Sequence, residues 1–319
     1  MNLGHRTYAV GPSAHGIMFH YFHSGARPSG QGSIDAAMLD ACLDYLGPRR
    51  VLSAGEWLWK CRRGRLEGDD LCLTFDDGLK CQYDVALPVL KSRGLTAFWF
   101  ICSAPLRGEP VMTEVYRLFR ATGFEAVQDF YEEFYRATAR AFPDYDLAAA
   151  LARFDPEPLR RAHPYYSIED LRFRFVRDEA LRENEYHVVM ARLLADRGLD
   201  VQSIADGLWM GRHELGELDR AGHEIGLHSH SHSTVFAQLS VPAQRREYEQ
   251  NVEALKEATG KTPVSVAHPC NSYGPETLNV LRSLGIELGF RGNLEPGDGS
   301  LLEIPRQDHA NLLSRMASR

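Results

Sequence analysis

The sequence predicts an α/β protein in which a mainly parallel sheet is interrupted by a long helical insertion. Near both ends of the chain, short apolar runs alternate with longer amphipathic segments, which is typical of strands joined by helices in a parallel sheet. From about residue 104 to 209 there is little strand signal, and apolar residues recur at helical spacing. The alternation is compatible with an open sheet or with a sheet closed into a barrel.

The expected elements follow from these runs in chain order. Aromatic and branched apolar residues favour strands, and a glycine directly after an amphipathic run favours a helix end. The expected strands are residues 16–22, 71–75, 96–101, 265–267, 288–291 and 301–305, with a further strand-like run at 224–227. The expected helices are residues 79–93, 241–259 and 275–284, which precede Gly94, Gly260 and Gly285.

Composition limits the class of partner. Acidic residues outnumber basic ones, and the formal net charge is -7, so an acidic surface would repel nucleic acid and anionic membranes. We expect no nucleic-acid partner and no membrane span. The first 16 residues do not resemble a signal peptide, which predicts a cytoplasmic protein. Six cysteines with no CxxC pair predict free thiols in that compartment.

The first chemical signal is a pair of adjacent carboxylates. The apolar run 71–75 leads directly into Asp76, Asp77 and Gly78, and in parallel α/β folds the loops at the carboxyl ends of strands carry the active site. Neighbouring carboxylates repel each other, so a metal ion or a set of backbone donors must offset the repulsion. An ordinary Asp-Gly turn is the alternative interpretation.

The second signal is a group of alternating histidines. His228, His230 and His232 follow the strand-like run 224–227, and imidazole is a good ligand for zinc and similar ions. A polar surface loop is the alternative. Taken together, two histidines and one aspartate give three ligands with open positions, the arrangement of a catalytic metal. The second aspartate is then available as a general base.

These residues carry a resemblance to the polysaccharide deacetylase family, carbohydrate esterase family four. Residues 74–78 match its T-F-D-D-G motif, and residues 228–232 match its H-[ST]-x-x-H motif. The resemblance implies Asp76 as catalytic base, and Asp77, His228 and His232 as ligands of a divalent ion, with zinc as the expected metal. It also implies a distorted (β/α) barrel, in which residues 1–103 and 210–319 form the two parts and residues 104–209 are a helical insertion.

Further positions resemble the family more loosely. Residues 267–271 occupy the place of an Arg-Pro-Pro-Tyr-Gly run but lack its arginine, so the resemblance implies the Cys270 N–H as oxyanion donor and Arg306 as the substitute that orients Asp76. The general acid of the family is a late histidine. His309 is the first candidate, and His20 and His23 from the first strand are its competitors, with His20 the stronger of the two.

The resemblance implies a metal-dependent hydrolase that removes an acetyl or formyl group from an N-acylated amino sugar, in surface polysaccharide synthesis. The expected partner is therefore an N-acylated sugar or sugar conjugate. The insertion is expected to cap the site, bind substrate or mediate a homodimer. The alternatives are an amidase of the same fold that cleaves a non-sugar C–N bond, and a non-catalytic carbohydrate-binding protein.

Overall fold

The computed structural model describes residues 14–47, 50–162, 166–295 and 299–318, so most of the segment considered for a signal peptide lies outside them. The chain divides into two compact units, of which the first comprises residues 1–111 and 207–319 and the second residues 112–206. Within the described ranges, no helix is long and apolar enough to cross a membrane. The described cysteines are all free thiols.

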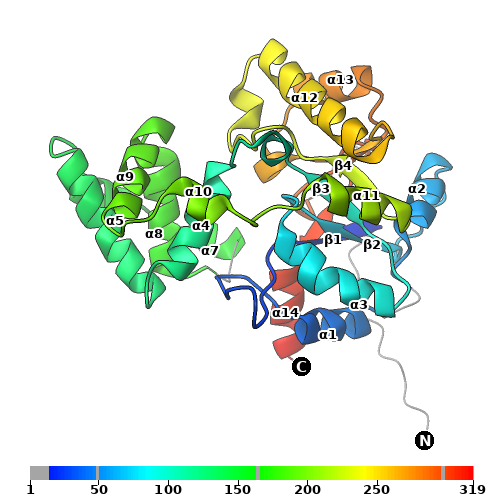
Figure 1. Ribbon diagram of the computed structural model, residues 1–319, viewed down its shortest axis with the longest axis horizontal. Helices are drawn as coiled ribbons and strands as arrows, with labels where there is room; N and C mark the ends of the chain where they lie inside the picture. Colours follow the sequence, from blue (N-terminus) through cyan, green and yellow to red (C-terminus); the bar gives the residue numbers. More distant parts are fainter. Residues whose placement is uncertain (1–13, 48–49, 163–165, 296–298, 319) are drawn as a thin grey trace, which may run out of the picture. The chain divides into compact units, whose positions relative to one another are not determined.

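The first unit is built on seven parallel strands in the order β6-β5-β4-β3-β2-β1-β7 (Figure 1). The strands are β1 His15–Phe19, β2 Leu71–Phe75, β3 Phe98–Ile101, β4 Glu224–Leu227, β5 Ser265–Ala267, β6 Leu288–Phe290 and β7 Arg306–Asp308. A parallel bridge between Phe290 and Ile304 joins the chain before β7 to β6, so the sheet forms a nearly closed barrel. The prediction of a distorted (β/α) barrel is confirmed.

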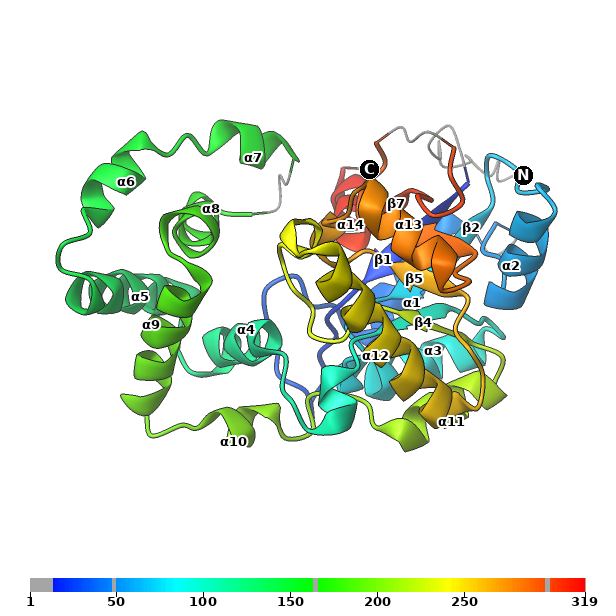
Figure 2. The ribbon, with the colours of Figure 1, turned by 90° about the horizontal axis from the view of Figure 1, so that it is seen from above.

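Helices surround this barrel in the first unit. They are α1 Ala36–Leu46, α2 Ala54–Arg62, α3 Leu87–Ser92, α11 Arg212–Arg220, α12 Val241–Thr259, α13 Pro275–Ser283 and α14 His309–Ala317. Short turns of other helix types are η1 Gln82–Ala86, η2 Ala104–Arg107, η4 Phe236–Gln238 and η5 Pro269–Asn271. Helix α12 packs between α11 and α13 and against β4 (Figure 2), and α1 contacts both α3 and α14.

Two element predictions need correction. The last strand is Arg306–Asp308 instead of residues 301–305, because Pro305 has no N–H for a ladder and the preceding residues reach β6 only through the bridge at Ile304. The helix expected at 79–93 contains the π-turn η1 before α3. Pro88 in the first turn of α3 offers no N–H to the carbonyl four residues earlier, which accounts for the wider turn.

The strands place alternate side chains inside and outside the barrel. Phe98 and Phe100 of β3 contact the ring of Phe290 on β6, with centroids 5.3 and 5.4 Å apart. Because β3 and β6 are not neighbours in the sheet, these rings meet through the barrel interior. The opposite face of β3 carries Trp99, which stacks on Phe75 of β2 at 4.4 Å and belongs to the core beneath the surrounding helices.

A buried histidine fixes the base of β3. His223 is 5% exposed, and its Nδ1 accepts hydrogen bonds from the backbone N–H of Ala97 at 3.0 Å and from the Trp99 indole at 3.1 Å. An acceptor nitrogen must be unprotonated. Burial accordingly lowers the pKa of His223 to about 4.

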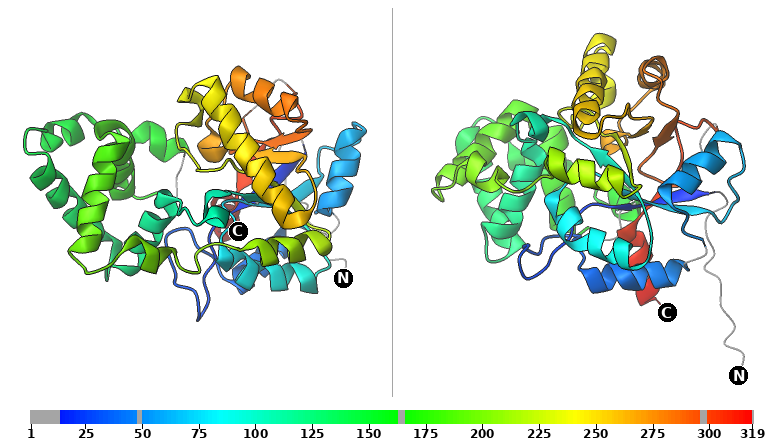
Figure 3. Two further views of the ribbon diagram at one scale, coloured as in Figure 1. Left: turned by 45° about the horizontal axis from the view of Figure 1, so that its top comes forward. Right: turned by 45° about the vertical axis from the view of Figure 1, so that its right-hand side comes forward.

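In the described residues of the second unit, helices are the only regular secondary structure (Figure 3). Its elements are α4 Met112–Thr122, α5 Val127–Ala141, α6 Leu147–Arg153, α7 Glu157–Ala162, α8 Ile168–Phe175, η3 Val176–Ala180, α9 Glu183–Ala195 and α10 Val201–Ala205. The rings of Phe130, Phe134 and Phe173 form its core. Asp170, fully buried beside them, accepts hydrogen bonds from Tyr131 and Arg174, so the unit has a satisfied polar centre of its own.

Candidate metal centre and its surroundings

Asp76 is held by a buried arginine. It follows β2, and both of its carboxylate oxygens accept hydrogen bonds from Arg306 on β7, at 2.7 and 2.8 Å. Arg306 is 1% exposed and also donates from Nε to the carbonyl of Arg291 at 2.7 Å. Burial raises the pKa of Asp76, but the charges of Arg306, His228 and His20 outweigh it and hold that pKa below its ordinary value.

Strand β1, which lies between β2 and β7, leaves space for the Asp76–Arg306 pair. A Cβ atom at Gly16 on β1 would lie 3.0 Å from Cγ of Arg306 and 3.1 Å from Cγ2 of Thr74. Real Cβ contacts are rarely so close. The glycine therefore lets the Arg306 side chain cross β1 inside the barrel and reach Asp76.

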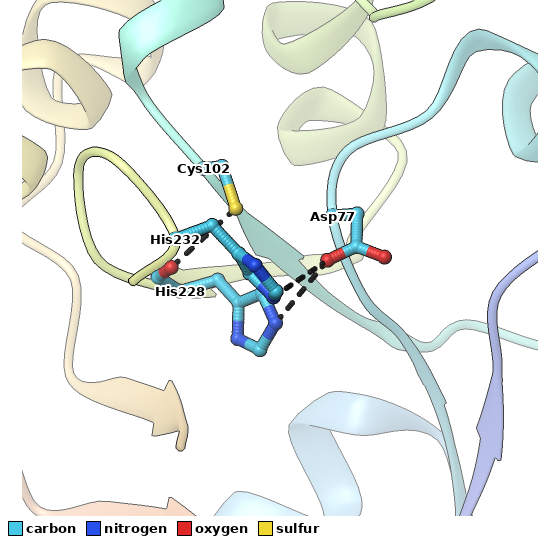
Figure 4. Close-up of side chains that lie close together, drawn as sticks. All are labelled: Asp77, Cys102, His228 and His232. Atoms are coloured by element: carbon cyan, nitrogen blue, oxygen red, sulfur yellow. Dashed lines mark hydrogen bonds and ion pairs between the residues drawn. The ribbon is translucent and has the colours of Figure 1, made fainter. Parts of the chain in front are cut away.

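Asp77 points to a different set of partners. Its backbone has a φ of 75°, a left-handed conformation that non-glycine residues adopt rarely and at some cost. Its Oδ1 atom lies 3.3 Å from Nε2 of His228 and 3.3 Å from Nε2 of His232 (Figure 4). The same Oδ1 is buried and makes no hydrogen bond.

The loop after β4 folds back on itself to bring its two histidines together. Ser229 and His232 both have left-handed backbones, with φ of 61° and 57°, and the His232 N–H donates to Oγ of Ser229 at 3.1 Å. The ring centroids of His228 and His232 are 5.0 Å apart as a result. The H-S-H-S-H run thus pairs its first and last members without a helix.

The tautomer of His228 shows that the three residues suit a metal ion. Its Nδ1 lies 2.9 Å from the carbonyl of Ala267, and a carbonyl can only accept, so Nδ1 carries the hydrogen. In the neutral ring Nε2 then directs a lone pair at Asp77. A cation between these atoms removes that repulsion. Ligand bonds of about 2.0–2.1 Å in tetrahedral geometry place neighbouring donors about 3.3–3.4 Å apart, close to the 3.3 Å separations of Asp77 from both rings.

The other histidine of the run belongs to a supporting network. Nδ1 of His230 is 2.9 Å from Oγ of Ser103. Glu247 of α12 accepts hydrogen bonds from the N–H groups of His230 and Ser231, at 3.0 and 2.8 Å. These contacts hold the loop in place. Hydrogen bonds to the residues around metal ligands commonly fix the orientation of the ligands themselves.

The structure separates the two candidates for the general acid. Nε2 of His20 is 3.7 Å from Oδ2 of Asp76, and its side chain is 24% exposed. His309 is 4% exposed, stacks on Phe19, and has Nε2 3.0 Å from the carbonyl of Gly32. His309 is therefore engaged with the loop after β1, whereas His20 lies beside Asp76.

Cys270 lies in the turn after β5. It is exposed and has a φ of 50° within Pro269–Asn271. The preceding His268 stands where the resembled family has an arginine. Its Nε2 is 2.8 Å from the carbonyl of Leu302, and burial lowers its pKa to about 4, so it is an uncharged group in the wall of the barrel.

One residue beside the candidate metal centre was not among the ligands predicted from the sequence. Cys102 directly follows β3, and its Sγ groups with the donor atoms of Asp77, His228 and His232 (Figure 4). Strand alternation was the available signal, because Cys102 continues the inward-facing series of Phe98 and Phe100.

Comparison with known proteins gives a family and a fold. The family described as polysaccharide deacetylase matches residues 179–289, a stretch that includes both histidine ligand candidates and begins after Asp76 and Asp77. No curated protein matches the chain.

Solved structures match over nearly the full length. The deacetylase PplD of Streptococcus pyogenes, in complex with acetate, has 15% identity and a TM-score of 0.55, with 95% of this chain and 97% of that chain covered. IcaB from Ammonifex degensii has 17% identity and a TM-score of 0.55, with 97% of each chain covered. The BpsB deacetylase domain from Bordetella bronchiseptica has 14% identity and a TM-score of 0.52, covering 93% of this chain and 96% of that chain. Identities this low establish the fold alone. Residues 179–289 are thus similar to the polysaccharide deacetylase family, and the solved structures show that the chain has the fold of such deacetylases.

Proposed function

We propose that the protein is a metal-dependent hydrolase that removes an acetyl or formyl group from the nitrogen of an amino sugar in a surface polysaccharide or its precursor. The observation that carries this proposal is the division of labour between adjacent carboxylates. Asp76 is paired with Arg306, while Asp77 faces two imidazole nitrogens. One carboxylate is thus suited to proton transfer and the other to metal binding.

Asp77, His228 and His232 would hold the metal, for which we propose Zn²⁺. When bound, the ion supplies Lewis acidity at the acyl oxygen and favours ionisation of a water molecule. Two neutral imidazoles and one carboxylate leave positions open for water and substrate, as in catalytic zinc sites. This donor set supports hydrolysis over mere sugar binding.

Asp76 is the proposed general base. Arg306 keeps it ionised and fixes the plane of its carboxylate through two hydrogen bonds, so a proton can be taken up without a search through rotamers. The same pairing weakens the basicity of Asp76. Precise orientation of the carboxylate offsets part of that loss.

His20 is the proposed general acid for the departing amine. It lies within 3.7 Å of Asp76 and keeps some exposure, as a group that meets substrate must. His309 is less suited to that role, because its Nε2 is engaged with the Gly32 carbonyl. The Cys270 N–H remains the proposed oxyanion donor: it follows Pro269 at the carboxyl end of β5.

The names of the structural relatives support the same reaction class. PplD and the BpsB domain are named as deacetylases, and the PplD structure contains acetate, the product of such a reaction. Those names describe those proteins, and the reaction of this chain needs its own test.

The test is release of free amine from N-acetyl and N-formyl amino sugars, as monomers and oligomers, with and without a chelator. The Asp76→Asn variant keeps the shape of the side chain and should retain stoichiometric metal while losing turnover. Metal content is measured on the same samples. Turnover by Asp76→Asn at the wild-type rate would exclude Asp76 as the base. Metal-loaded protein that releases no amine from any sugar would favour a binding protein or an amidase for other C–N bonds.

A further inference from the structure

A sulfur atom lies beside the three proposed ligands. The donor atoms of Asp77, Cys102, His228 and His232 all lie within 4.8 Å of one another (Figure 4), and Cys102 is 2% exposed. The buried Oδ1 of Asp77, which makes no hydrogen bond, points into the same group of donor atoms. We propose that Cys102 is a fourth, displaceable metal ligand that makes this site select Zn²⁺ or Co²⁺ over harder divalent ions.

The sheet holds Cys102 in this place. Strands β3 and β4 are paired, and the His228 N–H donates to the carbonyl of Ile101 at 3.2 Å. Pairing continues past the strand ends, where the Ser103 N–H donates to the carbonyl of Ser229 at 3.4 Å. Cys102 is therefore fixed opposite His228 from both sides. Because it alternates with residues that face outward, its side chain points into the barrel mouth.

Small movements suffice for ligation. A zinc–sulfur bond of about 2.3 Å beside nitrogen or oxygen bonds of about 2.1 Å places the sulfur about 3.6 Å from the other donors. The donor atoms now lie no more than 4.8 Å apart, so ligation shortens any of these separations by about 1.2 Å at most. The thiol now donates to the carbonyl of His228 at 3.5 Å. Ligation replaces this weak hydrogen bond, and the thiol proton passes to solvent.

Charge and softness determine which ion is favoured. One thiolate and one carboxylate neutralise a divalent cation, and two imidazoles complete a mixed nitrogen, oxygen and sulfur set. Thiolate ligands favour Zn²⁺ and Co²⁺, whereas Mn²⁺ and Mg²⁺ prefer oxygen. A site with carboxylate and imidazole alone discriminates less.

Four protein ligands would close a zinc site if all stayed bound. Water or substrate must therefore enter as a fifth ligand or displace the sulfur. Cys102 consequently sets metal preference and resting coordination, while Asp77, His228 and His232 remain the permanent ligands. This inference rests on the metal centre of the proposed function, but it concerns metal binding and can be tested without substrate.

The experiment uses the full chain, stripped with a chelator and loaded with Co²⁺. Thiolate ligation gives a sulfur-to-cobalt charge-transfer band in the near ultraviolet, which we expect in the wild type and expect to be absent in Cys102→Ser and Cys102→Ala. The matched control is Cys72→Ser. Cys72 also lines the barrel interior but lies outside the donor group, so its variant should keep the band.

Metal competition supplies the second readout. Cys102→Ser should weaken Zn²⁺ binding on the order of 10-fold or more and leave Mn²⁺ binding nearly unchanged, as measured against a chromophoric chelator. A wild-type Co²⁺ protein without the band, loss of the band in Cys72→Ser, or an unchanged preference for Zn²⁺ over Mn²⁺ would each overturn the proposal. Because the wild-type spectrum is itself decisive, a variant that fails to fold does not remove the test.

The two proposals fail in different ways. A charge-transfer band with no amine release from any sugar would refute the deacylase and leave the sulfur ligand standing. Amine release with no such band would refute the sulfur ligand and leave the deacylase standing.

Discussion

Replacement of Arg306 tests the most tightly constrained contact of the site. Arg306→Met keeps the length of the side chain but removes both hydrogen bonds to Asp76. Hydrogen bonds to charged groups contribute about 1.5–3 kcal/mol each, which gives a loss of about 3–6 kcal/mol for the two. Breaking one partner of a buried ion pair costs about 3–5 kcal/mol. We therefore expect the free energy of unfolding to fall by about 3–5 kcal/mol at pH 7.

Urea unfolding, followed by tryptophan fluorescence and by circular dichroism, measures this change. Chelator is present throughout, so that bound metal does not mask the loss. Because the chain has two compact units, separate transitions are fitted separately, and only the transition of the barrel unit should shift. Arg306→Lys, which keeps the charge but not the paired geometry, should fall between Arg306→Met and the wild type.

The double variant Arg306→Met with Asp76→Asn shows whether the loss comes from the uncompensated charge. Removing both charges of a buried pair is often nearly neutral, so the double variant should be more stable than the sum of the single changes predicts, by about 2 kcal/mol or more. Strict additivity would refute the reasoning. A loss below about 1 kcal/mol in Arg306→Met, the size of an exposed pair, would refute it as well.

Three further predictions concern catalysis, metal and pH. His20→Asn should lower kcat by about 10²–10⁴-fold with metal retained, and a larger loss in His309→Asn would return the acid role to His309. Zn²⁺ should raise the melting temperature of the chelator-stripped wild type by ligand linkage but not that of His232→Ala; an equal rise in both would place the metal elsewhere. The pKa of His223 is lowered to about 4, so the folded protein binds fewer protons than the unfolded chain between about pH 4 and 6.5, and stability should fall as the pH drops through that window. His223→Asn, which does not titrate there, should flatten the decline, and identical pH curves would contradict this account.

The barrel could largely be predicted from the sequence because its strands are short apolar runs that end in turn residues. The runs at residues 71–75 and 265–267 coincide with β2 and β5. The last strand was predicted at residues 301–305, too early in the chain, because that run contains the apolar residues whereas the strand itself, Arg306–Asp308, is polar. A strand whose inward side chain is a buried arginine gives no hydrophobic signal.

The candidate site divides along a similar line. Asp77, His228 and His232 come from two local motifs, and the structure brings all three together. The identity of the general acid depends on which of the two histidines, His20 or His309, faces Asp76. That choice depends on contacts between distant segments, such as the Gly32 carbonyl for His309. Cys102 was missed because a single cysteine after an apolar run has the same pattern as any buried thiol.

The adjacent aspartates differ in how their charges are balanced when the proposed metal is absent. Asp76 is compensated by Arg306, a group that stays charged at any ordinary pH. Asp77 instead faces histidines, which balance its charge only when they are protonated or bind a cation. The left-handed backbone of Asp77 turns its carboxylate toward those rings, away from the arginine. The electrostatic cost of an empty site therefore falls on Asp77 and its two histidines. Asp76 and Arg306 stay paired without a metal, so the proposed base would already be oriented when the proposed metal binds.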